Sequence, residues 1–147
     1  MAVGCPFITC AVKDKGIEFC WDCTECDTCR RWKQHRELGK QHDSFKSYQT
    51  LEDDILFVHK NGVDDFQNVQ KTREQFLKAM LRGFNEGRSK SYYCIAATVL
   101  RIEELRDSLS EARRKSVELD TKQKSHVLHS ILESVASERK YLLKLRK

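Results

Sequence analysis

The sequence has few of the residues that interrupt helices. Among its 147 residues there is one proline and there are six glycines, whereas 33% of the residues are charged. A β fold with many turns needs more turn residues than this, so the composition argues against one and favours a helix-rich protein. The length suits one ordinary domain and is too short for two of comfortable size.

Long apolar runs are also missing. No stretch reaches the roughly 18 consecutive apolar residues of a membrane-spanning helix. The start of the chain, Met1-Ala2-Val3-Gly4-Cys5, has neither a basic region nor a long apolar run, so no signal peptide is expected. We therefore expect a cytoplasmic protein without a membrane span.

A framed catalytic motif is absent as well. The sequence has no paired carboxylates in such a motif, no nucleophile elbow and no complete nucleotide-binding loop. Cys94 is an isolated thiol among apolar neighbours, and a buried, unreactive side chain is favoured over a nucleophile or an additional metal ligand. These absences favour a non-enzymatic protein.

Cysteine, in contrast, is abundant. Six of the seven cysteines lie within the first 29 residues, with the spacing Cys5-x4-Cys10-x9-Cys20-x2-Cys23-x2-Cys26-x2-Cys29. In a reducing compartment clustered thiols are typical of metal sites or redox groups, and an odd number argues against complete disulfide pairing. The spacing therefore predicts a thiolate metal site.

Zinc is the favoured metal. The predicted ligands are Cys5, Cys10, Cys20 and Cys23, in a closed tetrahedral site of structural type. Such a short segment buries too little apolar area to fold alone, so the metal is expected to stabilise it.

Cys26 and Cys29 leave other metal sites open. A 4Fe-4S cluster on Cys20, Cys23 and Cys26, completed by Cys5 or Cys29, is the main alternative. A second site that joins Cys26 and Cys29 to His35 and His42 is less favoured, because both histidines lie in polar surroundings.

The expected fold is mainly α. A cysteine-rich metal knuckle over residues 1–40 precedes a helical region over residues 41–147, with a bundle of four or five helices. Apolar periodicity and helix-ending residues place the elements as follows: a short helix from Pro6 ended by Gly16, favoured over a β-hairpin; a polar helix over 30–39 stopped by Gly39; a polar linker over 40–50; helices over 51–61, 66–84 and 91–109; and a last helix over 125–147. The 91–100 part also fits a buried strand by its length.

The last predicted helix has a short heptad-like seam. Its apolar positions are Leu128, Ile131, Val135, Leu142 and Leu145, and Glu138 interrupts the repeat. Two or three heptads are too few to identify a coiled coil, so packing on the protein's own core is favoured. An oligomer formed through this helix stays open, and a protein is the favoured partner.

Two basic stretches raise the alternative of a nucleic-acid accessory protein. Arg30-Arg31-Trp32-Lys33 combines basic and aromatic residues, and the part after Arg101 carries a basic excess. Gly87-Arg88-Ser89-Lys90-Ser91 precedes a predicted helix and fits an anion site. Solvated helix faces and a serine-capped helix start explain these stretches as well, and they are the favoured interpretation.

Two stretches resemble a known family. Residues 10–23, with Cys-Ala at the start, Lys-Gly-Ile in the middle and Cys-x2-Cys at the end, are similar to the cysteine-rich bacterial and archaeal family catalogued as domain of unknown function 3795. Residues 85–97 are similar to a phrase in its longer members. The resemblance implies a zinc-binding module without an established activity. After Cys23 the chain departs from the family's Glu-Phe-Pro-Cys phrase, and the last helix lies outside the resemblance.

Overall fold

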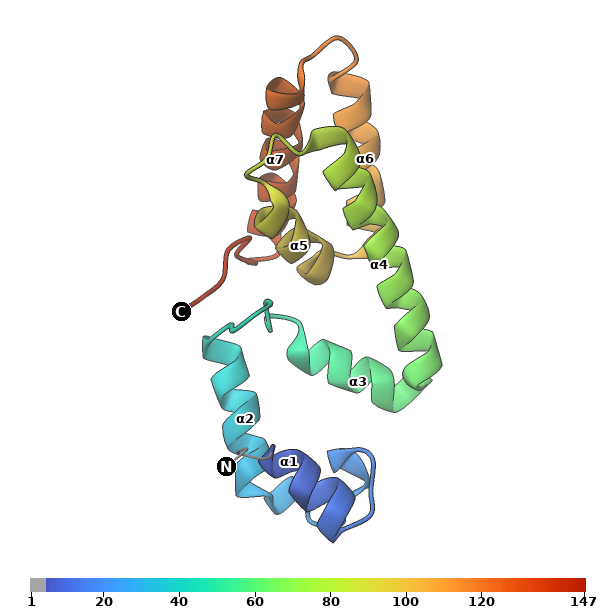
Figure 1. Ribbon diagram of the computed structural model, residues 1–147, viewed down its shortest axis with the longest axis vertical. Helices are drawn as coiled ribbons and strands as arrows, with labels where there is room; N and C mark the ends of the chain where they lie inside the picture. The colour runs from blue at the N-terminus through green and yellow to red at the C-terminus, as the bar shows by residue number, and fades with distance from the viewer. Residues whose placement is uncertain (1–4) are drawn as a thin grey trace. The chain divides into compact units, whose positions relative to one another are not determined.

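The protein is mainly α. The computed structural model describes residues 5–147, of which the helices and the termini can be followed in Figure 1. The structure is 71% helical, with helices α1 to α7 and no strand among the described residues, which confirms the predicted class. The chain divides into two compact units, Met1–Leu38 and Gly39–Lys147, here called the cysteine-rich unit and the helical unit. None of the described helices has the length and apolarity to span a membrane.

The cysteine-rich unit consists of short helical pieces. They are α1 (Pro6–Ile8), a π-helical segment η1 (Thr9–Asp14), two 3₁₀ turns η2 (Cys20–Asp22) and η3 (Cys26–Thr28), and the first part of α2 (Arg30–Gln41). Pro6 occupies the first helical turn, and Gly16 follows the helical stretch with a φ of 65°, which favours glycine. The predicted short helix is therefore confirmed, and the alternative β-hairpin does not form.

Helix α2 continues past Gly39, so the prediction that this glycine stops the helix is wrong. A Cβ atom on residue 39 would lie 2.8 Å from Leu51 Cδ2. The glycine therefore permits a close approach of Leu51 to the helix backbone instead of ending the helix. Sequence alone does not distinguish these two uses of glycine.

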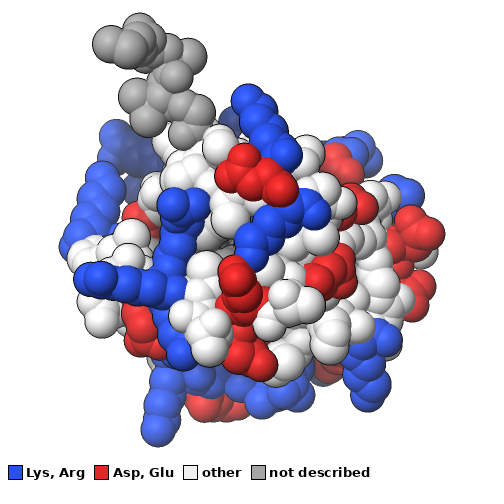
Figure 2. All heavy atoms as spheres, turned by 90° about the horizontal axis from the view of Figure 1, so that it is seen from below, with Lys and Arg blue, Asp and Glu red and all other residues white. Residues whose placement is uncertain are grey.

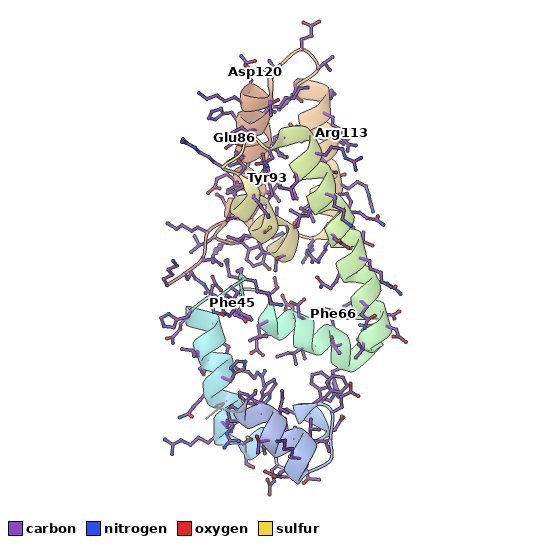
Figure 3. All side chains as sticks on the ribbon, viewed as in Figure 1. Phe45, Phe66, Glu86, Tyr93, Arg113 and Asp120 are labelled. Carbon is purple, nitrogen blue, oxygen red and sulfur yellow. The ribbon has the colours of Figure 1, made fainter. Side chains whose placement is uncertain are left out.

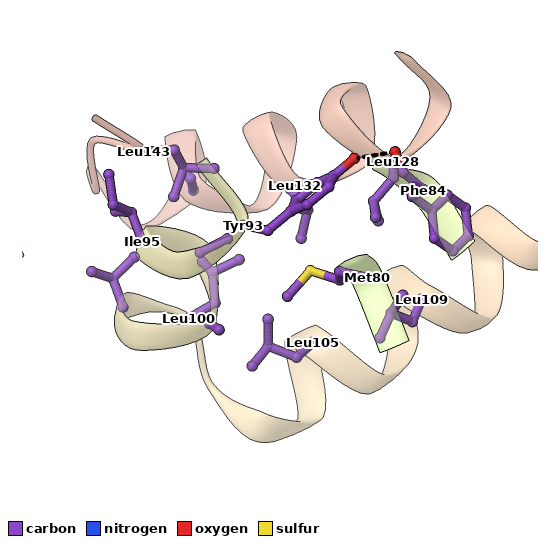
Figure 4. Close-up of a cluster of buried hydrophobic side chains, with 14 of the residues drawn as sticks. Met80, Phe84, Tyr93, Ile95, Leu100, Leu105, Leu109, Leu128, Leu132 and Leu143 are labelled. Atoms are coloured by element: carbon purple, nitrogen blue, oxygen red, sulfur yellow. Dashed lines mark hydrogen bonds between the residues drawn. The ribbon is translucent and has the colours of Figure 1, made fainter. Parts of the chain in front are cut away.

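The apolar core lies in the helical unit. Its helices are α3 (Leu51–Asn61), α4 (Val63–Phe84), α5 (Lys90–Val99), α6 (Ile102–Lys115) and α7 (Thr121–Glu138). Figure 4 shows side chains from the last four of these helices meeting in one cluster. The largest side chains that the cluster fully buries are Tyr93, Met80, Leu100, Leu105, Leu128 and Leu132. Helix α3 packs against α4, so the predicted bundle of four or five helices is confirmed.

The apolar stretch after Ser91 is helical, but it forms two helices instead of one continuous helix. Helix α5 ends at Val99, and α6 begins at Ile102. Arg73 Nη1 donates hydrogen bonds to the carbonyls of Ala97, at 2.8 Å, and Leu100, which satisfies the end of α5. The Arg101 amide donates to Glu104 Oε2 at 2.8 Å at the start of α6.

The last helix begins earlier and ends earlier than predicted. Asp120 Oδ1 accepts a hydrogen bond from the Gln123 amide at 2.8 Å, a cap that fixes the start of α7. The helix ends at Glu138, and Lys140 adopts a φ of 59°. Residues 139–147 are not helical, so the heptad-like seam does not extend to its last two leucines. The apolar face of α7 packs on the protein's own core, as favoured from the sequence.

The predicted linker over residues 40–50 is instead an ordered segment that contacts the C-terminal tail. Asp43 is buried and accepts hydrogen bonds from the Tyr48 amide at 2.7 Å and from Arg146 Nη2 at 3.1 Å. Gln49 exchanges two hydrogen bonds with the Leu142 backbone. Burial raises the pKa of the Asp43 carboxyl, but the hydrogen bonds from Arg146 and Tyr48 outweigh it and lower the pKa. Asp43 and Arg146, like Gln49 and Leu142, lie about a hundred positions apart, beyond the reach of local sequence patterns.

Truncation of the core should destabilise the helical unit strongly. Leu105 is fully buried, so Leu105→Ala is expected to lower the free energy of unfolding by about 2–5 kcal/mol through lost burial and a new cavity. Urea denaturation followed by circular dichroism measures this. Val117 is 77% exposed, and Val117→Ala should change the free energy by about 0.5 kcal/mol at most. Equal effects of the two substitutions would contradict the placement of the core.

The contact between the tail and residues 40–50 should matter for stability. Arg146→Met leaves the Asp43 carboxylate without its charged partner and should cost about 1–3 kcal/mol. Lys144 is exposed in the same tail, so Lys144→Met is the matched loss of one positive charge and should have little effect. Thermal unfolding of both variants at neutral pH tests this, and a similar loss in the two would argue against a specific Asp43–Arg146 pair.

Candidate metal centre

Five of the six N-terminal cysteines line one small pocket in the cysteine-rich unit. The pocket has a volume of about 90 Å³, and its cysteines are Cys10, Cys20, Cys23, Cys26 and Cys29. Apolar groups, among them Phe7, Ala11 and Ile17, also line it. Cys5 is exposed and is not among the residues that line the pocket. The structure therefore gathers the three other predicted zinc ligands and both additional candidates, but not Cys5.

Local backbone turns bring the cysteines together. Cys20 begins η2 and Cys26 begins η3, while Cys23 and Cys29 directly follow these turns. The amides of Cys23 and Cys29 donate to the carbonyls of Cys20 and Cys26, at 3.2 and 3.3 Å. Four cysteines at steps of three cannot converge from one straight helix, because each step rotates the side chain by about 300°. Two separate 3₁₀ turns remove this constraint.

A lysine places positive charge at the pocket. Lys15 Nζ donates a hydrogen bond to Cys23 Sγ at 3.1 Å and forms an ion pair with Glu25. The hydrogen bonds to Glu25 and Cys23 raise the pKa of Lys15, and the same ion pair lowers the pKa of Glu25. A cation beside clustered thiols offsets the negative charge that they acquire when they bind a metal.

The thiols differ in their acidity. Burial, followed by the neighbouring thiols of Cys26 and Cys29, raises the pKa of Cys20. Burial and Asp27 raise the pKa of Cys26. At the exposed Cys5, hydrogen bonds from the amides of Ile8 and Phe7 lower the pKa instead. A metal that binds Cys20 and Cys26 must therefore displace protons whose pKa is raised, whereas the pKa of Cys5 is lowered.

The side chains do not have the spacing of a formed metal site. Within residues 5–147, no three or more Cys, His, Asp or Glu side chains are grouped closely enough to hold an ion. The donor atoms nevertheless fit a thiophilic metal, because thiolates are preferred ligands of zinc and of iron–sulfur clusters. His35 packs its ring 5.0 Å from that of Phe7 and does not line the pocket, and His42 belongs to the helical unit.

The basic stretch at the start of α2 makes contacts inside the cysteine-rich unit. Arg31 Nη1 donates to the Pro6 carbonyl at 3.0 Å, and Trp32 meets the Phe7 ring edge-to-face at 6.3 Å. Arg36 lies over the Trp32 ring at 5.7 Å. Figure 2 shows acidic side chains interspersed with the basic ones on the visible face. These contacts give Arg31 and Trp32 a structural role inside the unit. They therefore do not favour the nucleic-acid alternative.

A cluster of hydrogen-bonded polar side chains in the helical unit was not predicted from the sequence. Glu86 Oε2 accepts hydrogen bonds from Ser89 Oγ at 2.6 Å and from Ser125 Oγ at 2.8 Å. His129 Nε2 lies 2.7 Å from Ser89 Oγ. Glu86 and Tyr93 are labelled in Figure 3. The Tyr93 hydroxyl donates a hydrogen bond to the Phe84 carbonyl at 3.0 Å. Ser89 does precede α5, as expected for a cap, but its hydroxyl bonds to Glu86 instead of capping the helix.

Cys94 lies apart from the other cysteines in sequence and is half-buried on α5 of the helical unit. Its carbonyl accepts a hydrogen bond from Thr98 Oγ1 at 2.8 Å. Because Cys94 is half-buried, it is more exposed than the sequence, with its apolar neighbours, led us to expect.

Comparisons with known proteins find no relatives. No protein-family model matches the chain, and neither the curated proteins nor the solved structures contain a match.

The half-buried His129 should make stability depend on pH. Burial lowers the pKa of His129, against the opposing influence of Glu86 and Glu133, and His126 lowers it further. Because the unfolded chain binds the proton more readily, the free energy of unfolding should fall as the pH drops from about 8 to about 5.

We expect His129→Gln to reduce this slope, whereas His42→Gln, at an exposed position, should leave it unchanged. Urea denaturation at a series of pH values measures both. An unaltered slope in His129→Gln would show that other groups cause the dependence.

Proposed function

We propose that the cysteine-rich unit is a metal-binding module, with zinc as the favoured ion, and that the bound ion stabilises a surface for protein interaction. The observation that carries this proposal is the convergence of five cysteines on one pocket. Free cysteines pack individually as small apolar side chains, which does not explain five of them around the same space. The protein is proposed to be non-enzymatic and cytoplasmic.

The lack of an apolar core in this unit supports the proposal. Ala11 is the only buried apolar residue among residues 5–38. A unit of this size without a core needs another source of folding free energy. Structural zinc supplies on the order of 10 kcal/mol in small domains of this kind.

A closed structural zinc site has four ligands, and the pocket offers five cysteines. We propose that Cys10, Cys20 and Cys23 act with Cys26 or Cys29, because Cys5 lies outside the pocket. Binding must draw the sulfur atoms closer together, because they do not yet have the spacing of a metal site. Lys15 would remain beside Cys23 and reduce the net negative charge of the thiolate site.

The surface of the unit supports a protein partner. Ile8 and Val12 are each 55% exposed, four positions apart on the helical stretch formed by α1 and η1. Exposed apolar side chains at this spacing share one helix face, which is typical of a docking surface. The metal would hold this face in place.

An iron–sulfur cluster is the second candidate. The specific observation in its favour is that Cys20, Cys23 and Cys26 line the same pocket together with Cys29. A Cys-x2-Cys-x2-Cys run with a fourth cysteine is a ligand pattern of 4Fe-4S clusters. A coloured protein that dithionite bleaches would identify the cluster, and a colourless protein with stoichiometric zinc would exclude it.

We also propose membership of the cysteine-rich family of unknown function 3795. Support for this comes from the motif over residues 10–23 and from the similarity of residues 85–97 to a phrase in some longer members of the family. The comparisons with known proteins neither support nor contradict this membership.

Cysteine substitutions test the proposed site. Cys20→Ser removes a thiol at the centre of the pocket and should abolish metal binding and order in the cysteine-rich unit. Cys94→Ser and Cys5→Ser remove thiols outside the pocket and should leave the metal content unchanged. Elemental analysis of anaerobically purified protein gives the metal identity and the number of ions per chain.

Two results would contradict this assignment. Equal metal loss in Cys20→Ser and Cys94→Ser would mean that the N-terminal pocket is not the site. Metal loss in Cys5→Ser would restore Cys5 as a ligand and overturn the proposed ligand set.

A further inference from the structure

A second cavity lies in the helical unit, where the segment before α5 meets the first half of α7. Its volume of about 490 Å³ falls within the range of small-molecule sites. Every residue that lines it is polar or charged: Glu86, Arg88, Ser89, Lys122, Ser125, His126 and His129. The metal-binding proposal does not use any of these residues.

The floor of the cavity is built from buried hydroxyl groups in fixed orientations. Ser89 and Ser125 are 2% and 4% exposed, and both hydroxyls donate to Glu86 Oε2. A hydroxyl has one proton, so Ser89 cannot also donate to His129. The ring nitrogen of His129 must therefore carry the proton and donate to Ser89 Oγ at 2.7 Å.

This arrangement argues against a serine nucleophile. In a nucleophilic pair the histidine accepts the serine proton, whereas here the carboxylate of Glu86 accepts it. The cluster instead fixes the positions of hydroxyl and imidazole groups, as in a binding site.

The charges that face the cavity are unequal. Arg88 and Lys122 are cationic and exposed at its rim. The hydroxyls of Ser89 and Ser125 lower the pKa of Glu86 to about 2, so Glu86 is anionic, and its Oε2 is already occupied by the two serines. With both histidines neutral, the lining carries one net positive charge, and protonation of either histidine increases it.

We propose that this cavity binds a small molecule through a phosphate group. Two flexible cations beside imidazole groups match a dianionic phosphate better than a carboxylate, which carries one charge. The guanidinium of Arg88 offers a planar pair of donors, and Lys122, which lines the same cavity, offers a point charge. The limited volume suits a free phosphomonoester instead of a nucleic-acid backbone.

Calorimetric titration of the full-length, anaerobically purified protein with inorganic phosphate tests the proposal at constant ionic strength. Arg88→Gln and Lys122→Gln should each weaken phosphate binding about tenfold or more. Arg114 is exposed on α6 and does not line the cavity, so Arg114→Gln is the matched loss of one charge and should have less than about a twofold effect. The side chains replaced are exposed, so all three variants should keep the parent's unfolding midpoint.

Nuclear magnetic resonance gives an independent readout. In the parent protein phosphate should shift the imidazole resonances of His126 and His129, and in Arg88→Gln the shift at the same subsaturating concentration should be several times smaller.

Several outcomes would overturn the proposal. They are the absence of binding at millimolar phosphate, equal weakening in Arg88→Gln and Arg114→Gln, and complete replacement of phosphate by chloride at the same ionic strength. Binding of an oligonucleotide that phosphate does not displace would also overturn it, because the site would then recognise a macromolecule. None of these results depends on the metal content of the cysteine-rich unit.

Discussion

The account depends on one constraint: the cysteine-rich unit has almost no apolar interior of its own. Ala11 is its only buried apolar residue over residues 5–38, whereas the helical unit buries a continuous cluster from four helices. Hydrophobic burial therefore explains the helical unit and cannot explain the other. The pocket that gathers five thiols is the feature of the small unit that offers another source of stability.

Different interactions therefore hold the two units together. In the helical unit, side chains such as Met80 and Leu132 fix the packing through apolar contact. In the cysteine-rich unit, single turns and backbone hydrogen bonds place the sulfur atoms, and Lys15 supplies a compensating charge. Under the proposed function, a metal ion would join these pieces, because the apolar residues of this unit bury almost no surface.

Much of the fold follows from local sequence patterns. The period of the apolar residues identifies α3, α4 and α7, and Pro6 with Gly16 delimits the first helical stretch. Local patterns gave the wrong end for α2, because glycine also serves close packing, as at Gly39. They also gave one helix where Leu100 and Arg101 separate two, because the capping hydrogen bonds come from Arg73, far along the chain.

The candidate sites were predictable to different degrees. Cysteine spacing singled out the residues that line the pocket, but it did not show that Cys5 lies outside it. The Glu86–Ser125 and Ser89–His129 contacts join residues about forty positions apart, so the stretch around Ser89 gave no sign of its partners on α7. The Asp43–Arg146 pair joins residues even more distant in sequence, so a segment that appeared to be a solvated linker is ordered.

Hydrogen exchange before and after anaerobic removal of metal tests the central claim most directly, because it reports local stability residue by residue. The account predicts that the native protein contains a thiolate-bound ion, and that its removal abolishes amide protection over residues 5–38 while residues 51–138 stay protected. Unchanged protection over residues 5–38 in protein that contains no metal would contradict it.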